Sequence, residues 1–213
     1  MAHSYSSIST HSKCARKYQY AYILRVPVKS IPSPQMERGT AVGESIENFM
    51  LRRSEQLHPD IHKSHGQMML SIRESTKCTP ERKWAVTSDW KKTKFDSKDA
   101  WLRGVFDLDT PTEVYEWKTG KVYDDHIDQR YLYGLIKLIL EPKLDHTIVR
   151  EVYFDQKGKD ANQHFLRDHL EFMKQDWVGR VARVEGEKIF SPNPTYLCGY
   201  CSFSKQNGGP CEF

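Results

Sequence analysis

The sequence predicts an α/β domain in which a mixed central β-sheet is flanked by helices. Two kinds of pattern support this fold class: short segments that alternate apolar and polar residues, and longer segments whose apolar residues recur at helical spacing. The length of 213 residues is sufficient for one proper hydrophobic core and favours one domain over two. The whole chain, residues 1–213, is therefore expected to form a single domain.

The first part of the chain is expected to be helical. Apolar residues fall on one face of a helix in two long segments, about Ser6–Leu24 and Gln35–Gln56. A shorter helix is expected near Gly66–Glu74. Between the two long helices, Val26–Pro34 contains three prolines, which predict an extended connector.

The remainder of the chain is expected to supply the sheet. Alternation and enrichment in β-branched and aromatic residues predict four strands, at Lys83–Trp90, Trp101–Leu108, Thr112–Lys118 and Thr147–Phe154. A helix is expected from about Asp125 to Leu140, and a final helix from about Ala161 to Val184.

Two carboxylates and a lysine lie in the hairpin formed by the second and third predicted strands. Turn residues in Asp109–Thr112 connect these strands. If the turn is symmetric, Asp107 lies opposite Val114, and Asp107, Glu116 and Lys118 then project from one face of the sheet. Two acidic groups beside an ammonium group form a site for a hard divalent cation and an activated water, which is the arrangement that phosphodiester hydrolysis needs.

An exposed polar face with cross-strand ion pairs is the alternative interpretation of these three residues. Trp117 separates Glu116 from Lys118, and the segment around them is rich in aromatic residues. We therefore expect partial burial, and buried strand residues do not carry charge without a reason. This argument favours a chemical site.

Several motifs follow one another in a defined order along the chain. They are Gly104–Asp107, Glu116–Gly120, Gln129 with Tyr133, the N-terminal segment Ser6–Tyr18 and the C-terminal segment Pro192–Cys201. This ordered set resembles the PD-(D/E)xK nuclease superfamily, and in particular its RecB-like exonuclease branch. The resemblance spans the chain from about Ser6 to Cys211, and the small size is similar to that of stand-alone exonucleases carried by bacteriophages.

The resemblance implies a restriction-endonuclease-like core with N- and C-terminal segments joined near a cysteine cluster. It also implies a DNA exonuclease that depends on Mg²⁺ or Mn²⁺ and acts in DNA recombination, repair or degradation. Two alternatives stay open, an endonuclease on the same fold and a catalytically weakened DNA-binding module.

The resemblance assigns a role to each site residue. Asp107 and Glu116 hold the metal, the backbone carbonyl of Trp117 is a further ligand, and Lys118 positions or polarises the attacking water. Residues expected to contact DNA or to support the lysine are Gln129, Tyr133 and Arg16. An ordinary helix face is the alternative for the pair Gln129 and Tyr133, because residues four apart commonly share a face.

One position departs from the family pattern. The family usually carries Gly-x-x-x-His in its second helix, with the histidine as a metal ligand, whereas Gly39 is here followed four residues later by Gly43. Three explanations are open: fewer metal ions, substitution of the missing ligand by Glu44 or Glu47, or an alteration that weakens catalysis.

Cysteines near the C-terminus form a second candidate site. Cys198, Cys201 and Cys211 lie close together in the sequence, which indicates a metal rather than disulfides. By resemblance to iron–sulfur nucleases, Cys14 supplies a fourth ligand to a [4Fe–4S] cluster. Zinc, or no metal, remains the alternative, since thiolates alone do not separate zinc from iron–sulfur.

Composition agrees with a DNA partner without requiring one. The formal charge is +4 and the pI about 8.7, with basic and aromatic residues interleaved near both Lys17 and Lys92. A recombination or replication protein is a further expected partner. Apolar runs stay short of the roughly 18 residues of a membrane helix, so a cytoplasmic protein is expected, in the host cytoplasm if a phage encodes it.

Overall fold

The structure is a computed structural model that describes residues 1–28, 33–62, 65–123, 126–155 and 160–213. The chain divides into two compact units. Unit 1 comprises Met1–Ala2 and Pro32–Gln175, and unit 2 comprises His3–Ile31 and Asp176–Phe213. A single domain over the whole chain therefore stays a prediction.

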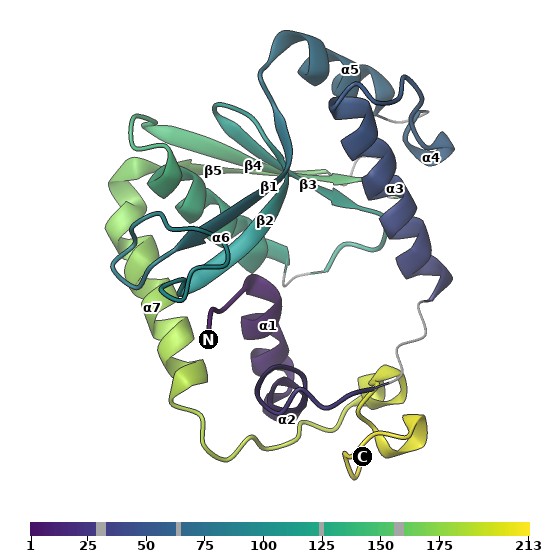
Figure 1. Cartoon of the computed structure of the whole chain (residues 1–213), viewed down its shortest axis with the longest axis vertical. Helices are drawn as coiled ribbons and strands as arrows, with labels where there is room; N and C mark the ends of the chain where they lie inside the picture. Colours follow the sequence, from purple (N-terminus) through teal and green to yellow (C-terminus); the bar gives the residue numbers. More distant parts are fainter. Residues whose placement is uncertain (29–32, 63–64, 124–125, 156–159) are drawn as a thin grey trace. The chain divides into compact units, whose positions relative to one another are not determined.

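A five-stranded mixed sheet forms the centre of unit 1 (Figure 1). The strands are β1 (Thr79–Val86), β2 (Leu102–Asp109), β3 (Glu113–Lys118), β4 (His146–Tyr153) and β5 (Ala161–Leu166). They lie side by side in sequence order, with β3 and β4 parallel and the other neighbours antiparallel. The predicted α/β fold with a mixed central sheet is thus confirmed.

Helices cover both faces of this sheet because the strands alternate between two apolar surfaces. On one face, Tyr115 and Trp117 of β3 pack in a core with α3 (Pro34–Met50) and α5 (Gly66–Ser75). A short helix, α4 (Pro59–His62), precedes α5. On the other face lies α6 (His126–Leu140), which is the crossover that the parallel pair β3 and β4 requires.

Arg38 fixes α3 against the ends of two strands. Its Nε donates to Asp60 Oδ2 at 2.6 Å, and its Nη1 donates to Asp155 Oδ2 at 2.6 Å and to the Thr119 carbonyl at 3.1 Å. Thr119 follows β3 directly, so this guanidinium ties the helix to the strand that carries Glu116 and Lys118. The position of α3 beside that strand matters for the site described below.

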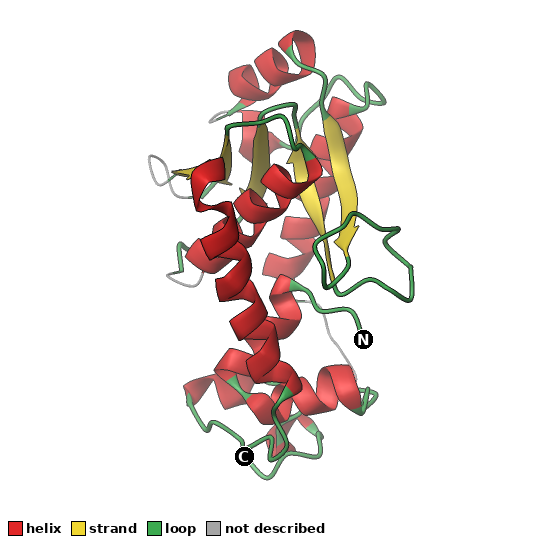
Figure 2. Cartoon of the chain, turned by 90° about the vertical axis from the view of Figure 1, so that its left-hand side faces the viewer, coloured by secondary structure: helices red, strands yellow, loops and turns green. Residues whose placement is uncertain are grey.

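Unit 2 brings the two ends of the chain together. Its elements are α1 (Tyr5–Lys13), α2 (Ala15–Tyr18), η1 (Gln19–Ile23), η3 (Tyr196–Tyr200) and η4 (Lys205–Asn207), and the unit boundary falls within α7 (Leu170–Glu185). Figure 2 shows these C-terminal elements as short helices joined by loops. The His3 ring lies 3.0 Å from the Glu185 carboxylate, and Asn193 donates to the Lys13 carbonyl at 2.9 Å. The expected joining of the terminal segments is confirmed.

The expected helix from Ala161 to Val184 is wrong over its first part. Ala161–Leu166 is the edge strand β5, and α7 begins only at Leu170 after a 3₁₀ turn. The reason is tertiary packing, because Phe165 lies directly against Gly134 of α6 while its strand pairs with β4.

Other element boundaries also differ from the sequence prediction. The first helix is broken at Cys14, whose backbone is extended, and α3 ends at Met50 rather than Gln56. The first strand runs Thr79–Val86 rather than Lys83–Trp90. The connector Val26–Pro34 includes residues 29–32, and the start of the Asp125 helix includes residue 125, which lie outside the described residues.

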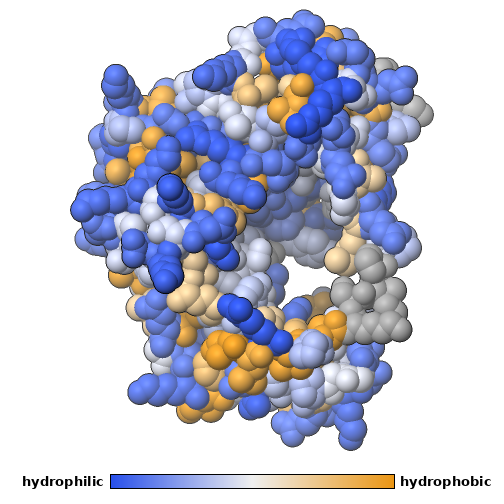
Figure 3. Space-filling view, in the orientation of Figure 1, coloured by the Kyte–Doolittle hydropathy of each residue, from blue (hydrophilic) through white to orange (hydrophobic). Residues whose placement is uncertain are grey.

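The face shown in Figure 3 is largely hydrophilic, with isolated apolar residues in its upper part and a group of them in its lower part. Among the described residues, none of the helices has the length and apolar character that a bilayer crossing would need.

Two helix glycines should respond in opposite ways to alanine. A Cβ on Gly134 would lie 2.3 Å from the buried ring of Phe165, whereas a Cβ on Gly179 would meet no atom within 4 Å. Gly134→Ala should lower the free energy of unfolding by about 1–3 kcal/mol through overpacking. Gly179→Ala should raise it by up to about 1 kcal/mol. Urea unfolding of both variants checks this, and equal effects would contradict the packing.

Candidate active site

The hairpin of β2 and β3 has a very short ladder, limited to the pairs Leu108–Tyr115 and Asp109–Val114. The expectation that Asp107 lies opposite Val114 is therefore wrong by two residues, because the turn is centred between Pro111 and Thr112, one residue later than the symmetric turn assumed. A shift of two residues preserves the alternation, so Asp107 still shares a face with Glu116. Continued in this register, Asp107 faces Glu116 directly.

Side chains replace backbone partners where the two strands part. The Asp107 carboxylate accepts the Trp117 backbone N–H at 2.8 Å, and the Tyr133 hydroxyl donates to the Val105 carbonyl at 2.9 Å. The first contact satisfies a backbone N–H that a continued β2–β3 ladder would have paired, since Trp117 would then stand opposite Phe106. The opening between β2 and β3 is thus a built feature of the sheet.

A closed hydrogen-bond network organises one side of this opening. Lys118 Nζ donates to Glu116 Oε1 at 3.0 Å and to Gln129 Oε1 at 2.8 Å. Gln129 Nε2 in turn donates to Glu116 Oε1 at 2.8 Å and to the Tyr133 hydroxyl at 3.1 Å. Gln129 and Tyr133 lie one turn apart on α6 and are both buried. They therefore support Lys118 from the interior of the protein.

The electrostatics of the site show excess negative charge. Burial, and then the neighbouring Glu116 carboxylate, raise the pKa of Asp107 well above its usual range. Burial, then Glu116 and Asp107, likewise raise the pKa of the Tyr133 hydroxyl well above its usual value. Two carboxylates this close favour either a shared proton or a bound cation.

An open cleft of ≈ 640 Å³ adjoins this pair. Besides Asp107 and Glu116, its lining includes Gly43, Glu44 and Glu47 of α3. Both glutamates predicted as substitute ligands therefore reach the cleft. A Cβ on Gly43 would meet nothing within 4 Å, so the place that a histidine would take in the family pattern is open space.

The donor set fits a divalent cation. Glu116 is only 8% exposed, and its Oε2 atom has no hydrogen-bond partner among the described residues. A buried carboxylate oxygen without a partner is costly, and a hard cation would satisfy it. Trp117 also lines the cleft, and its backbone carbonyl is the further ligand that the family resemblance predicts.

Sequence reasoning missed two carboxylates that extend this pair into a row across four strands. In the register of β1 with β2, Glu81 stands opposite Asp107, between the pairs Pro80–Leu108 and Arg82–Phe106. In the register of β3 with β4, Glu116 pairs with Glu151. Each strand from β1 to β4 thus contributes one member to the row Glu81, Asp107, Glu116, Glu151.

The two added members differ in their surroundings. Glu151 is fully buried, and its Oε2 accepts hydrogen bonds from Arg130 of α6 and from the Tyr153 hydroxyl. Burial raises the pKa of Glu151 despite the adjacent Arg130. Glu81 is exposed on the cleft and is the second acidic group, after Glu116, that raises the pKa of Asp107. Glu81 could have been found from the sequence only if the start of β1 at Thr79 had been known. That start brings Glu81 into the strand and sets it opposite Asp107.

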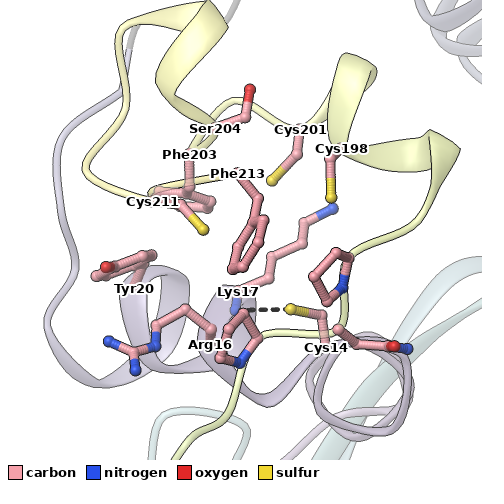
Figure 4. Close-up of a pocket in the computed structure, with 13 residues that line it drawn as sticks. Cys14, Arg16, Lys17, Tyr20, Cys198, Cys201, Phe203, Ser204, Cys211 and Phe213 are labelled. Atoms are coloured by element: carbon pink, nitrogen blue, oxygen red, sulfur yellow. Dashed lines mark hydrogen bonds between the residues drawn. The ribbon is translucent and has the colours of Figure 1, made fainter.

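The predicted iron–sulfur residues lie in unit 2, around one pocket (Figure 4). All four cysteines line it: Cys14, Cys198, Cys201 and Cys211. Figure 4 shows the Phe213 ring in the space between the Cys14 thiol and the other three. The Cys14 sulfur accepts the Lys17 backbone N–H at 3.5 Å and so caps α2. Arg16 lines the same pocket, and its Nε donates to the Phe190 carbonyl at 2.8 Å.

Within the part of the chain that the structure describes, no group of three or more His, Cys, Asp or Glu side chains is arranged to hold a metal ion. The cysteines therefore share a pocket without forming a ligand set as they stand. Likewise, the catalytic candidates offer two close carboxylates rather than a complete set of protein ligands.

Two aspartates on β2 should have opposite effects on stability. In EDTA at neutral pH, Asp107→Asn should raise the melting temperature, because it removes a charge held beside Glu116. Because folding raises the pKa of Asp107, the protein loses stability as pH rises from about 3.9 towards that raised pKa. The melting temperature of the variant should therefore fall less over this pH range than that of the parent.

Asp109→Asn is the matched comparison. Asp109 accepts from the buried Lys137 ammonium at 2.7 Å and also pairs with Arg82. Its neutralisation leaves a buried cation with weakened compensation and should cost about 3–5 kcal/mol of unfolding free energy. Thermal melts of both variants at pH 5 and pH 8 test the pair. A lower melting temperature for Asp107→Asn at pH 8 would contradict the electrostatic description.

Comparisons with known proteins bear on the fold and the family of this chain. A crystal structure of a candidate exonuclease from Eubacterium rectale has a TM-score of 0.52 at 12% sequence identity, covering 94% of this chain and 86% of that chain. The structure of SSO0001 has a TM-score of 0.43 at 13% identity over 99% of this chain and 85% of that chain, too low for any argument. The first likeness supports the fold alone.

Among curated proteins, none matches the chain significantly. The sequence model of the PD-(D/E)XK nuclease superfamily matches residues 2–206, which is nearly the whole chain and includes Asp107, Glu116 and Lys118. The chain therefore belongs to the PD-(D/E)XK nuclease superfamily.

Proposed function

We propose that this nuclease is a metal-dependent DNA exonuclease of the RecB-like branch. The observation that carries the proposal is the hydrogen-bonded group of Glu116, Lys118 and Gln129 beside Asp107, at an open cleft. Mg²⁺ or Mn²⁺ is the expected cofactor, since all the candidate ligands are oxygen atoms.

Asp107, Glu116 and the Trp117 carbonyl would hold the cation. When bound, it supplies a water of lowered pKa and neutralises charge that develops on the phosphate. Glu116 divides its two oxygens between tasks: Oε1 receives Lys118 and Gln129, whereas the buried Oε2 is available to the cation. The same carboxylate would therefore couple the lysine to the metal.

Lys118 would orient the attacking water or a phosphate oxygen. An ammonium group has three donors, and two of them are used by Glu116 and Gln129. Within the described part of the chain the third has no partner, so it would be available to the reacting group in a direction that the other two hydrogen bonds fix. Burial of Gln129 and Tyr133 favours their role as support for Lys118 rather than as direct DNA contacts.

Exonuclease rather than endonuclease action is supported by the motif resemblance and by the description of the Eubacterium rectale protein. End-labelled linear DNA and covalently closed circular DNA separate the two activities. Loss of linear substrate with intact circles is expected, and cutting of the circles would replace the proposal by an endonuclease. A role in recombination, repair or degradation of DNA in a bacteriophage, and a recombination or replication protein partner, stay predictions from the resemblance.

Removal of the chemical groups should stop cleavage while DNA binding survives. Glu116→Gln and Lys118→Met should each lower the rate on linear DNA by about 100-fold or more in Mg²⁺ and Mn²⁺. DNA affinity in Ca²⁺, measured by fluorescence anisotropy, should stay near that of the parent, because the two changes together remove only one positive charge, that of the half-buried Lys118.

The matched control is Glu74→Gln, a change of the same chemistry at an exposed position on α5. It should cleave at the parent rate. Parent-rate cleavage by both site variants would place the active site elsewhere.

The cysteines are proposed to hold a structural [4Fe–4S] cluster, with zinc as the alternative. Support comes from the meeting of all four thiols at one pocket of unit 2, from opposite ends of the chain. A shared cofactor would act as a long-range staple, since the unfolded chain cannot present these ligands together.

Metal content decides among these alternatives. Anaerobically purified protein should be brown and contain about four irons per chain. Cys198→Ser should bleach it and lower the melting temperature, whereas Cys78→Ser should leave the colour and the iron content unchanged, because Cys78 packs against the core of unit 1 and does not line the cysteine pocket. A colourless preparation with one zinc per chain would indicate a zinc site, and one with neither metal would leave four plain thiols.

A further inference from the structure

Two cations of β1 and β2 lack the close carboxylate partners that the other cations of the sheet have. Three lysine or arginine residues of the described strands contact a carboxylate at 3.0 Å or less: Arg82, Lys118 and Arg150. Lys83, by contrast, is exposed and forms no ion pair among the described residues. Arg103 has Asp96 at 3.7 Å, and that carboxylate is 89% exposed. Structural ion pairing therefore does not account for Lys83 and Arg103.

Both cations lie on the face of the sheet that carries Asp107. Arg103, Val105 and Asp107 follow one another at intervals of two along β2, and all three are partly exposed. Lys83 of β1 pairs with Val105, and residues paired in register share a face. Arg103 lies four residues from Asp107, which is about 13 Å along a strand. Positive charge thus begins a short distance from the candidate active site.

The loop between β1 and β2, residues 87–101, folds back along the outer edge of β1. The Thr93 backbone N–H donates to the Ala85 carbonyl at 3.0 Å. This path brings the Phe95 ring beside the two cations, with its centroid 5.5 Å from Lys83 Nζ and 4.9 Å from Arg103 Cζ. Contacts of this kind between a cation and an aromatic ring are attractive, so Phe95 helps to hold both side chains in position.

Further positive charge lies in the same loop. Its exposed lysines are Lys91, Lys92, Lys94 and Lys98. Among the described residues, only Lys91 of these four has an ion pair, with Asp89 at 2.6 Å. Residues 83–103 contain six basic and three acidic residues, a net charge of +3, whereas unit 1 contains 23 basic and 24 acidic residues, a net charge of −1. This segment is therefore basic within a unit that is slightly acidic.

Trp90 places an aromatic ring among these lysines. The ring is half-buried and packs against Trp101 in a T-shaped arrangement, with centroids 5.2 Å apart. Its backbone is in the left-handed region, with φ of 63°, and its N–H donates to the Thr87 carbonyl at 2.9 Å. A bulky residue adopts this conformation only where the surrounding structure holds it there. Lysines around a fixed aromatic ring are the combination that binds single-stranded nucleic acid, because unpaired bases stack on such rings.

The cleft itself does not supply the charge that a DNA strand needs. Five of the described residues that line it are acidic, and none of them is lysine or arginine. The nearby Lys118 is already paired with Glu116. A bound cation compensates the phosphate at the reaction centre, but the phosphates next to it would meet uncompensated negative charge. Positive side chains beyond the cleft must therefore hold the strand.

We propose that a basic strip, formed by Lys83, Arg103, Lys92 and Lys94 together with Trp90, binds the single-stranded part of the DNA next to the cleft. This inference rests on the proposed nuclease function and adds to it the form of the substrate and the surface that holds it. The cations contact successive phosphates, and Trp90 stacks on a base. Because phosphates and stacked bases carry little sequence information, the strip binds strands of any sequence.

The salt dependence of binding measures the phosphate contacts. The probe is a labelled oligothymidine of about 20 nucleotides, longer than a typical single-strand site, followed by fluorescence anisotropy in Ca²⁺. Over about 50 to 200 mM salt, Lys83→Gln and Arg103→Gln should each lower the slope of log K against log salt by about 0.7, and each should weaken binding about 3-fold. Arg103→Lys keeps the charge and should keep the slope. Trp90→Ala should weaken binding at least about 5-fold without changing the slope.

The matched control is Lys143→Gln, which removes an exposed lysine from the turn between α6 and β4. Its affinity and slope should equal those of the parent. Since Lys83 and Lys143 are both exposed, neither substitution should change the melting temperature. In Mg²⁺, Lys83→Gln should raise KM for the oligothymidine about 3-fold and leave kcat near the parent value, because the lost contact lies outside the reaction centre.

Parent affinity and parent slope in both Lys83→Gln and Arg103→Gln would overturn the inference, and cleavage by these variants would then leave the nuclease proposal intact. An equal loss of slope on a blunt duplex of the same length would also overturn it, by assigning the strip to double-stranded DNA. A parent that binds oligothymidine in a Lys83-dependent manner but does not cleave DNA would refute the nuclease proposal and leave this inference standing.

Discussion

The structure depends on how it holds a row of acidic groups across the middle of a sheet. Glu116 and Glu151 are buried on adjacent parallel strands, and each is contacted by one cation, Lys118 and Arg130 respectively. Asp107 has instead a single backbone N–H and no cation within hydrogen-bonding distance among its described contacts. Charge is thus compensated at one end of the row and left in excess at the other, where the cleft opens. The fold therefore tolerates uncompensated negative charge at this site, as folds commonly do at active sites.

The same strand shows the contrast between structural and functional carboxylates. Asp109, two residues beyond Asp107, is paired with Arg82 and with the buried ammonium of Lys137, which also donates to the Thr110 carbonyl at 2.6 Å. These contacts close the turn end of the hairpin and fix its register. Because β2 and β3 are held firmly there, they can separate two residues further on without losing the alignment of Asp107 with Glu116.

Sequence patterns predicted the features that depend on local spacing. The strands around Asp107 and Glu116, the helix that carries Gln129 and Tyr133, and the α/β fold class all follow from periodicity and from ordered motifs. Features that depend on neighbours distant in the sequence were not predictable. The segment from Ala161 is a strand because β4 offers a free edge, and Glu81 joins the site because β1 extends through Pro80, a residue that argues against a strand on its own. Glu44 and Glu47 line the cleft, and their role as substitute ligands stays a prediction.

Helix α6 also decides how the chain can vary in length. Four side chains within three turns of α6 hydrogen-bond to three strands. The bonds run from Gln129 to Glu116, from Arg130 to Glu151, from Tyr133 to Val105 and from Lys137 to Asp109. One residue inserted or deleted inside it would rotate everything downstream by roughly 100° and detach part of this set at once. The length of the loop between β1 and β2 does not affect the position of these side chains, since the two strands are already paired at Val86 and Leu102. Length variation among related chains should therefore accumulate in that loop and be absent from α6.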